Sequence, residues 1–295
     1  MKAVFTTKVE PHYDDLPEQR YHFPRTYLRQ VQNAVGDWIV YYEPRRSTQD
    51  LTSFGGRQAY FAVAHVADIK EDPAKIDHFY ARIDNFLQFT DPVPFREGQT
   101  YFEKILQRDD GKTNRGAFGR AVRNMSDDEF DAIVASGFSQ TDAPSGQPTI
   151  DGFMEDLTPF KRPIVERIVQ RPFRDAAFAA LIKRAYDDTC AMTGLKIING
   201  GGRAEVQAAH IRPVARQGSD SVRNGIALSG TMHWMFDRGL VSIGDDFSIL
   251  IARDKVPDTV GRLLVEDRKL LLPRRPDIRP HAGYLDFHRK HVFKG

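Results

Sequence analysis

Alternating apolar and polar residues mark the first half of the chain as β structure. The runs at 38–42 (WIVYY) and 59–66 (AYFAVAHV) are rich in β-branched and aromatic residues, and a polar turn with glycines at 53–57 separates them. Residues 79–83 alternate between apolar and polar side chains, and we expect this strand to end before Pro92-Val93-Pro94. The pattern predicts a small barrel-like sheet.

Two helices follow from local patterns further along the chain. Ser126 and Glu129 have capping-box spacing in front of an apolar face, which predicts a short helix that closes the first domain near Gly137. The apolar residues between 173 and 185 fall on one side of a helical wheel, so we expect a second helix that ends near Asp187.

The stretch between these helices has the composition of a linker. Residues 139–163 hold four prolines among Ser, Gly, Asp and Thr and show no sustained periodicity. A chain of 295 residues also exceeds the usual size of one domain. We therefore expect an α+β protein with an N-terminal domain over 1–137, a linker over 138–170 and a C-terminal domain over 171–295.

The residues with the most informative chemistry lie between positions 205 and 243. Alternation over 206–210 predicts a strand with His210 near its end, just before Pro213. Asn224-Gly225 is a turn dipeptide that leads into a second apolar strand at 226–228. The order strand, loop, strand is thereby predicted.

A helix is expected next, with Thr231 as its cap and Phe236 near its end. His233 and Asp237 are four residues apart and would project from the same helical face. An imidazole and a carboxylate so placed can chelate one divalent ion, and these donors together suit Mg²⁺, Mn²⁺, Ni²⁺ or Zn²⁺. The sequence predicts a divalent-metal site without identifying the metal.

Composition narrows the possible classes. The net charge of +2 is too small to establish nucleic-acid binding, and each recurring basic pair is first interpreted as solvated surface. One cysteine, Cys190, excludes an internal disulfide and a multi-cysteine metal knuckle, and we expect it to be a small buried apolar residue. No apolar run is long enough for a membrane span, and the first 20 residues lack a signal-peptide pattern, so we expect a cytoplasmic protein.

The segments AAHIRP, NGIAL and HWMFDRG resemble the sequence motifs of the HNH nuclease superfamily, in the branch found in bacterial restriction enzymes. The likeness covers residues 190–251 and implies a ββα-metal fold. It further implies that His210 is the general base, that Asn224 braces the loop and orients the His210 ring, and that His233 binds the metal together with Asp237.

Two departures from the common family pattern affect the metal site. Many members carry Asp or His immediately before the base, whereas Ala209 cannot bind a metal, so the third ligand is water, Glu205 or Gln207. Members with a structural zinc have paired CxxC motifs, whereas Cys190 offers one sulfur. No structural zinc is expected.

The N-terminal segments YHFPRTYL and GDWIVYYEPRR look like segments of PUA-superfamily modules of the EVE or SRA-like kind. This resemblance implies a PUA-like β-barrel that flips a modified cytosine, 5-methyl- or 5-hydroxymethylcytosine, into an aromatic pocket. Trp38, Tyr21 and Phe23 are the candidates for that pocket. Alternatively, these rings form the core of the barrel itself.

Together these features predict a modification-dependent, type IV-like restriction endonuclease that binds double-stranded DNA and acts as a homodimer. Two alternatives stay open. One is an HNH nicking enzyme, or an RNA- or structure-directed nuclease, without specificity for a modified base. The other is a non-catalytic nucleic-acid reader.

Overall fold

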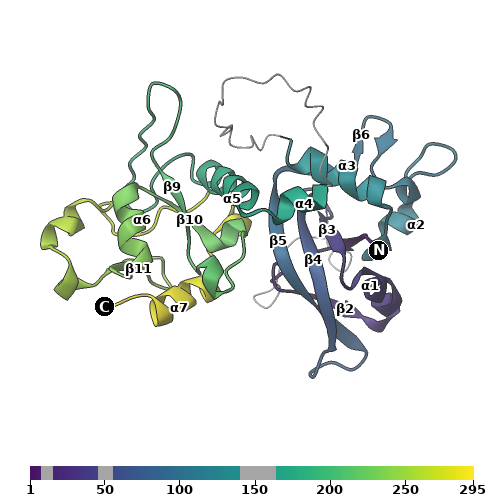
Figure 1. The fold of residues 1–295 in the computed structure, drawn as a ribbon, viewed down its shortest axis with the longest axis horizontal. Helices are drawn as coiled ribbons and strands as arrows, with labels where there is room; N and C mark the ends of the chain where they lie inside the picture. The colour runs from purple at the N-terminus through teal and green to yellow at the C-terminus, as the bar shows by residue number, and fades with distance from the viewer. Residues whose placement is uncertain (8–15, 46–55, 140–163) are drawn as a thin grey trace, which may run out of the picture. The chain divides into compact units, whose positions relative to one another are not determined.

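The computed structural model describes residues 1–7, 16–45, 56–139 and 164–295. The chain divides into two compact units, residues 1–177 and 178–295, which are described separately below (Figure 1). Most of the expected linker, residues 140–163, lies outside the described residues, and so does the larger part of the turn expected at 53–57. No helix in the described ranges is long and apolar enough to cross a membrane.

A six-stranded sheet in the order β2-β5-β4-β3-β1-β8 organises the first unit. Strands β1 and β3 are parallel, and every other neighbouring pair is antiparallel. The strands are β1 (Ala3–Thr6), β2 (Arg20–Pro24), β3 (Trp38–Glu43), β4 (Ala59–Glu71), β5 (His78–Pro94) and β8 (Val122–Asn124). A separate small hairpin consists of β6 (Arg96–Glu97) and β7 (Thr100–Tyr101).

The predicted strands are present, but the expected end of the third was wrong. Strand β5 continues through Pro92 and Val93 to Pro94, and Pro94 lies opposite Ala59 of β4. The reason is the place of this stretch in the sheet. In the described residues, β2 pairs with residues 78–82 of β5, so the proline-containing end has β4 alone as its neighbour. Proline is tolerated at such an edge because no ladder hydrogen bond from its nitrogen is needed there.

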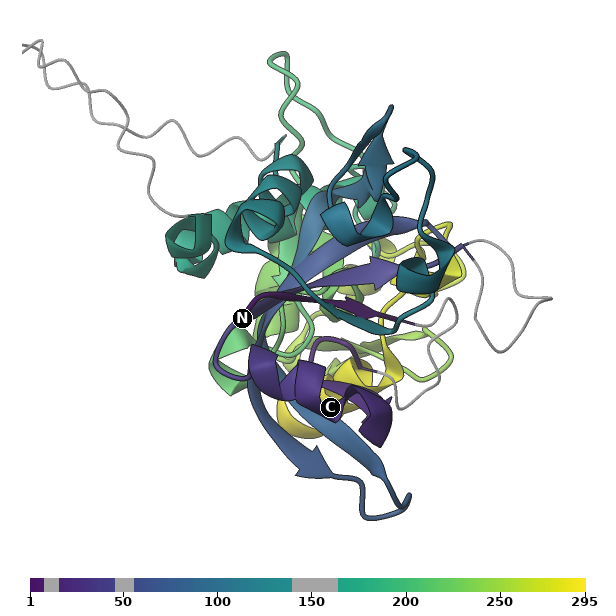
Figure 2. The same cartoon turned by 90° about the vertical axis from the view of Figure 1, so that its right-hand side faces the viewer.

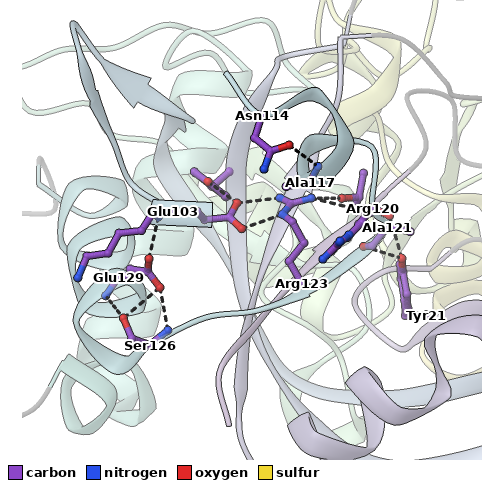
Figure 3. Close-up of polar contacts among 12 residues, drawn as sticks. Tyr21, Glu103, Asn114, Ala117, Arg120, Ala121, Arg123, Ser126 and Glu129 are labelled. Atoms are coloured by element: carbon purple, nitrogen blue, oxygen red, sulfur yellow. Dashed lines mark hydrogen bonds and ion pairs between the residues drawn. The ribbon is translucent and has the colours of Figure 1, made fainter. Parts of the chain in front are cut away.

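The sheet is curled, so that strand β2 at one edge approaches the other edge (Figure 2). The hydroxyl of Tyr21 on β2 donates to the carbonyl of Thr6 at 3.0 Å and lies 3.4 Å from that of Ala121, next to β8 (Figure 3). The Tyr21 ring also packs on Phe5 of β1, with 4.6 Å between centroids. Register shifts between β3, β4 and β5 add to the twist that such curling needs.

Helices cover both faces of the sheet. Val31 of α1 (Leu28–Ala34) packs into the core on one face. Phe130 of α3 (Asp127–Gly137) and Ile168 of α4 (Ile164–Val169) pack into the core on the other. The first unit also contains η1 (Arg25–Tyr27), η2 (Lys104–Leu106) and α2 (Arg115–Phe118). The predicted capping box is confirmed, because Ser126 and Glu129 bond reciprocally in front of α3 (Figure 3).

Helix α5 (Arg171–Ala185) contains the division between the units and ends two residues before the predicted position. In the second unit, β9 (Gln207–His210) and β10 (Gly225–Leu228) form an antiparallel pair, and α6 (Gly230–Asp237) follows. The remaining elements are η3 (Val214–Arg216), η4 (Val222–Asn224), β11 (Val241–Ile243), β12 (Ile249–Ile251), η5 (Arg253–Lys255), η6 (Asp258–Arg262), η7 (Pro276–Ile278) and α7 (Ala282–His291). Cys190 is fully buried in the core of this unit, as expected.

Candidate nuclease site

His210 is the last residue of β9, and its imidazole is held on one edge and one face. Nε2 lies 2.9 Å from Oδ1 of Asp220, whose side chain is buried. The ring of Phe178 stacks on the imidazole, with 3.8 Å between centroids and 10° between planes. A carboxylate accepts hydrogen bonds, so Nε2 carries the proton in a neutral ring and Nδ1 keeps the lone pair. The arrangement thus supplies a proton acceptor of fixed orientation.

Asn224 is fully buried and ties together the loop between β9 and β10. Its side-chain oxygen accepts from the backbone N–H of Arg212 at 2.9 Å, and its amide nitrogen donates to the carbonyls of Arg212 and Ser219. A Cβ on Gly218 would lie 1.8 Å from the carbonyl oxygen of Arg212, so the loop closes where only glycine fits. Asn224 therefore holds the loop that carries Asp220.

Gly225 lies directly opposite His210 in the strand pair. A Cβ at this position would approach Ile182 to 2.3 Å and the Phe178 ring to 2.7 Å. The missing side chain lets α5 pack closely on the hairpin, and the same packing places Phe178 against the His210 ring.

His233 and Asp237 lie one turn apart on α6, as predicted, with 3.4 Å between Nε2 and Oδ2. Nδ1 of His233 lies 2.8 Å from the side-chain oxygen of Gln207 on β9. Because that oxygen accepts, Nδ1 carries the proton and Nε2 is left with its lone pair directed toward Asp237. Histidines that bind metals are usually held by such a hydrogen bond on the other ring nitrogen.

These residues fit a divalent ion with open coordination positions. His233 and Asp237 supply one nitrogen and one carboxylate, and in the described part of the chain no three His, Cys, Asp or Glu side chains are placed to hold one metal ion together. Of the candidates for a third ligand, Glu205 accepts from the backbone N–H of Gly230 at 2.8 Å, and Gln207 holds His233. Water and phosphate oxygens would complete the coordination.

The expected cap of α6 was wrong. The helix begins at Gly230 with Ser229 as its N-cap, two residues before Thr231. Glu205 satisfies the first backbone N–H from a distant position in the chain, a contact that local sequence spacing does not predict.

The two groups of contacts lie toward opposite ends of β9. Gln207, which bonds His233, begins the strand, and His210, which bonds Asp220, ends it. Three residues of extended chain separate their Cα atoms by about 10 Å.

The three aromatic candidates of the first unit are not brought together. Tyr21 and Phe23 belong to the core on one face of the sheet, whereas Trp38 belongs to the core on the other face and packs edge-on against His65. All three rings are buried, with at most 9% of their surface exposed.

Sequence reasoning missed two contributors to the His210 site. Asp220 lies in the polar run GSDS, ten residues after His210, which has the composition of an ordinary loop. Phe178 was assigned only to the apolar face of a helix. Gln207 is one of three candidates for a third metal ligand, beside water and Glu205, and in the structure its side-chain oxygen lies 2.8 Å from Nδ1 of His233.

Comparison with known proteins identifies the class of this site. Residues 190–244 match the family model described as HNH endonuclease, and this match confirms the resemblance based on His210, Asn224 and His233. The second unit thus contains a segment, residues 190–244, that is similar to HNH endonucleases.

Three solved structures are similar to parts of the chain. The first is a modification-dependent TagI restriction endonuclease (14% identity, TM-score 0.32, 89% of this chain and 64% of that one). The second is the N-terminal domain of McrB from Staphylothermus marinus (12% identity, TM-score 0.31, 45% of this chain and 92% of that one). The third is the type IV phosphorothioation-dependent restriction endonuclease ScoMcrA (13% identity, TM-score 0.21, 79% of this chain and 46% of that one). The chain thus spans less than two thirds of the TagI and ScoMcrA chains, and no curated protein matches it.

Proposed function

We propose that the protein is a divalent-metal-dependent HNH endonuclease with His210 as its general base. The observation that carries this proposal is the bond between His210 and Asp220 within a segment that matches the HNH model. With Nε2 engaged by Asp220, Nδ1 accepts the proton of the water that attacks the scissile phosphate. The buried carboxylate then stabilises the positive charge that forms on the ring, as an orienting acid does in other His-based catalysts.

His233 and Asp237 are the residues proposed to hold the metal. A bound divalent ion supplies Lewis-acid stabilisation of the negative charge that develops on the phosphate and the leaving oxygen. Gln207 keeps the His233 ring in the tautomer and orientation that this role requires. In this proposal β9, β10 and α6 constitute a ββα-metal core.

The first unit is proposed to be a PUA-like reader of modified cytosine in double-stranded DNA. The segments YHFPRTYL and GDWIVYYEPRR support this assignment as a reader, and so does the curled sheet closed by the Tyr21 contacts. The proposed whole is a cytoplasmic, modification-dependent restriction endonuclease in which the first unit, residues 1–177, contains the reader and the second unit, residues 178–295, contains the nuclease domain. A homodimer would provide two centres for the two DNA strands.

Cleavage assays test this function directly. The protein is incubated with Mg²⁺, Mn²⁺ or Ni²⁺ and matched duplexes that carry cytosine, 5-methylcytosine or 5-hydroxymethylcytosine. We expect metal-dependent cleavage of the modified duplexes, loss of cleavage in His210→Ala, and normal cleavage in His291→Ala, an exposed histidine of α7. Equal cleavage of all duplexes would remove the reader and favour the nicking or structure-directed alternative. Binding without any metal-stimulated cleavage would favour the non-catalytic reader.

A further inference from the structure

A cavity of about 860 Å³ opens in the first unit beside the β6–β7 hairpin. Its wall comes from this hairpin, from the turn at 108–113 and from the start of α2. Among the lining residues that the structure describes, four are cationic and none carries a carboxylate; the cations are Arg96, Arg108, Lys112 and Arg115. We call this cavity the basic pocket.

Hydrogen bonds within the wall fix its shape. The hydroxyls of Tyr101 and Thr113 are 2.6 Å apart, which joins the hairpin to the turn. Across the turn, the N–H of Arg108 donates to the carbonyl of Lys112 at 2.8 Å. Behind the wall, Tyr101 packs with Leu106 in a small apolar cluster. The cationic side chains therefore project from an ordered backbone.

A buried ion pair anchors this wall to the main sheet. Glu103, between the hairpin and the turn, receives two hydrogen bonds from the guanidinium of Arg123 on β8, at 2.7 and 2.8 Å (Figure 3). The hydroxyl of Tyr60 on β4 donates to the same carboxylate at 2.6 Å. A two-pronged, charge-assisted contact of this kind restricts both position and orientation.

The charges of the basic pocket are only weakly neutralised. Asp110 lies 3.7 Å from Arg108 and 3.9 Å from Lys112, beyond hydrogen-bond distance, and those cationic side chains are 60% and 80% exposed. Exposed pairs of this kind contribute little, and another anion can replace the carboxylate. The guanidinium of Arg96 lies over the Tyr101 ring at 5.8 Å, a stacking that leaves its edge N–H groups able to donate.

We propose that the basic pocket binds the phosphodiester backbone of duplex DNA. Four cations spread around an open cavity suit a chain of phosphates, which is contacted by exposed Arg and Lys side chains. A site for one small anion would instead need donors that converge on a single buried point. The inference rests on the proposed function, and it assigns to this pocket backbone contacts that hold the first unit on its substrate.

Duplex binding by the full chain tests this inference. Fluorescence anisotropy with a labelled duplex is measured over a range of salt concentrations for the wild type and for Arg108→Gln/Arg115→Gln. The control, Arg25→Gln/Lys75→Gln, removes two exposed cations of the same unit that do not line the pocket. We expect the pocket variant to bind about tenfold more weakly and its salt slope to fall by about 1.8, since each lost phosphate contact removes about 0.9.

Two outcomes overturn the inference. The first is a pocket variant with the affinity and salt slope of the control. The second is displacement of the duplex by inorganic phosphate at concentrations where chloride of equal ionic strength has no effect, which would indicate a small-anion site. His210→Ala separates this inference from the proposed function, because it should bind the duplex like the wild type and not cleave it. Cleavage by that variant would refute the nuclease mechanism and leave the pocket result standing.

Discussion

The carboxylate of Asp220, in the loop that joins β9 to β10, lies 2.9 Å from Nε2 of His210. Asp220 itself is 1% exposed, so its charge faces the imidazole in a site that excludes most water. A buried carboxylate in this position stabilises a ring that becomes positively charged during proton abstraction.

Asp220→Asn should therefore slow cleavage by about 100-fold while leaving DNA affinity unchanged, since positioned general bases contribute at least that factor. Single-turnover cleavage rates and equilibrium binding of the duplex check both points. An unchanged rate with a normal melting temperature would show that Asp220 has no part in catalysis.

Gln207→Ala should weaken metal binding without removing a metal ligand. Loss of a residue that holds a metal-binding histidine typically costs about 10- to 100-fold in affinity. Calorimetric titration of the DNA-free protein with Mn²⁺ measures this affinity directly. Asp237→Asn should weaken binding at least as much, and the exposed Asp245→Asn is the control. If Gln207→Ala binds Mn²⁺ like the wild type, the assignment of His233 as a ligand loses its structural support.

His288 makes the second unit sensitive to acid. Its ring is buried, stacks on Phe236 and bonds Ser242, and burial lowers its pKa from 6.5 to about 4. The unfolded chain binds the proton more readily than the folded one, so stability is full above pH 6.5 and declines as the pH falls toward 4. The slope in this window is about 1.4 kcal/mol per pH unit.

Urea unfolding followed by circular dichroism at pH 7 and pH 5 measures this loss. His288→Gln should have a lower free energy of unfolding at pH 7 and a smaller dependence on pH between 5 and 7. The exposed His291→Gln should retain the dependence of the wild type. An identical pH dependence in His288→Gln and wild type would assign the acid sensitivity to other groups.

Gly225→Ala should destabilise the second unit by about 1–3 kcal/mol, the usual cost of forcing a methyl group into a close-packed contact. The added Cβ would meet Ile182 and Phe178 at 2.3 and 2.7 Å, so the Phe178 stack on His210 must shift and cleavage should fall as well. Gly200→Ala is a matched control, because no atom lies within 4 Å of its Cβ position. Equal unfolding midpoints for the two variants would contradict the close packing described.

Sequence reasoning succeeded where the signal is local. The capping box of Ser126 and Glu129 is encoded within four residues, and the strands around Trp38 and Phe61 follow from runs of β-branched and aromatic side chains. The resemblance to HNH nucleases could also be recognised from the sequence. His210, Asn224 and His233 lie within one short segment, and their spacing combines with the apolar pattern between them.

The failures concern contacts between distant parts of the chain. Thr231 is a good cap by type, but Glu205 from another segment satisfies the helix start at Gly230. Asp220 contacts His210 from a loop that Asn224 closes through hydrogen bonds to the carbonyls of Arg212 and Ser219. Aromatic residues such as Tyr21 and Trp38 suit a binding pocket and a sheet core equally well by type, and the pairing register of their strands places them on opposite faces of the sheet.

The prolines at the end of β5 have a consequence for how the protein behaves at high concentration. Pro92 and Pro94 are exposed on a stretch whose ladder partner is β4. An open strand edge can recruit an extended segment from another molecule, which is a route to aggregation. Proline offers no N–H to such a segment, so these two residues keep the exposed end of a 17-residue strand from templating intermolecular sheets.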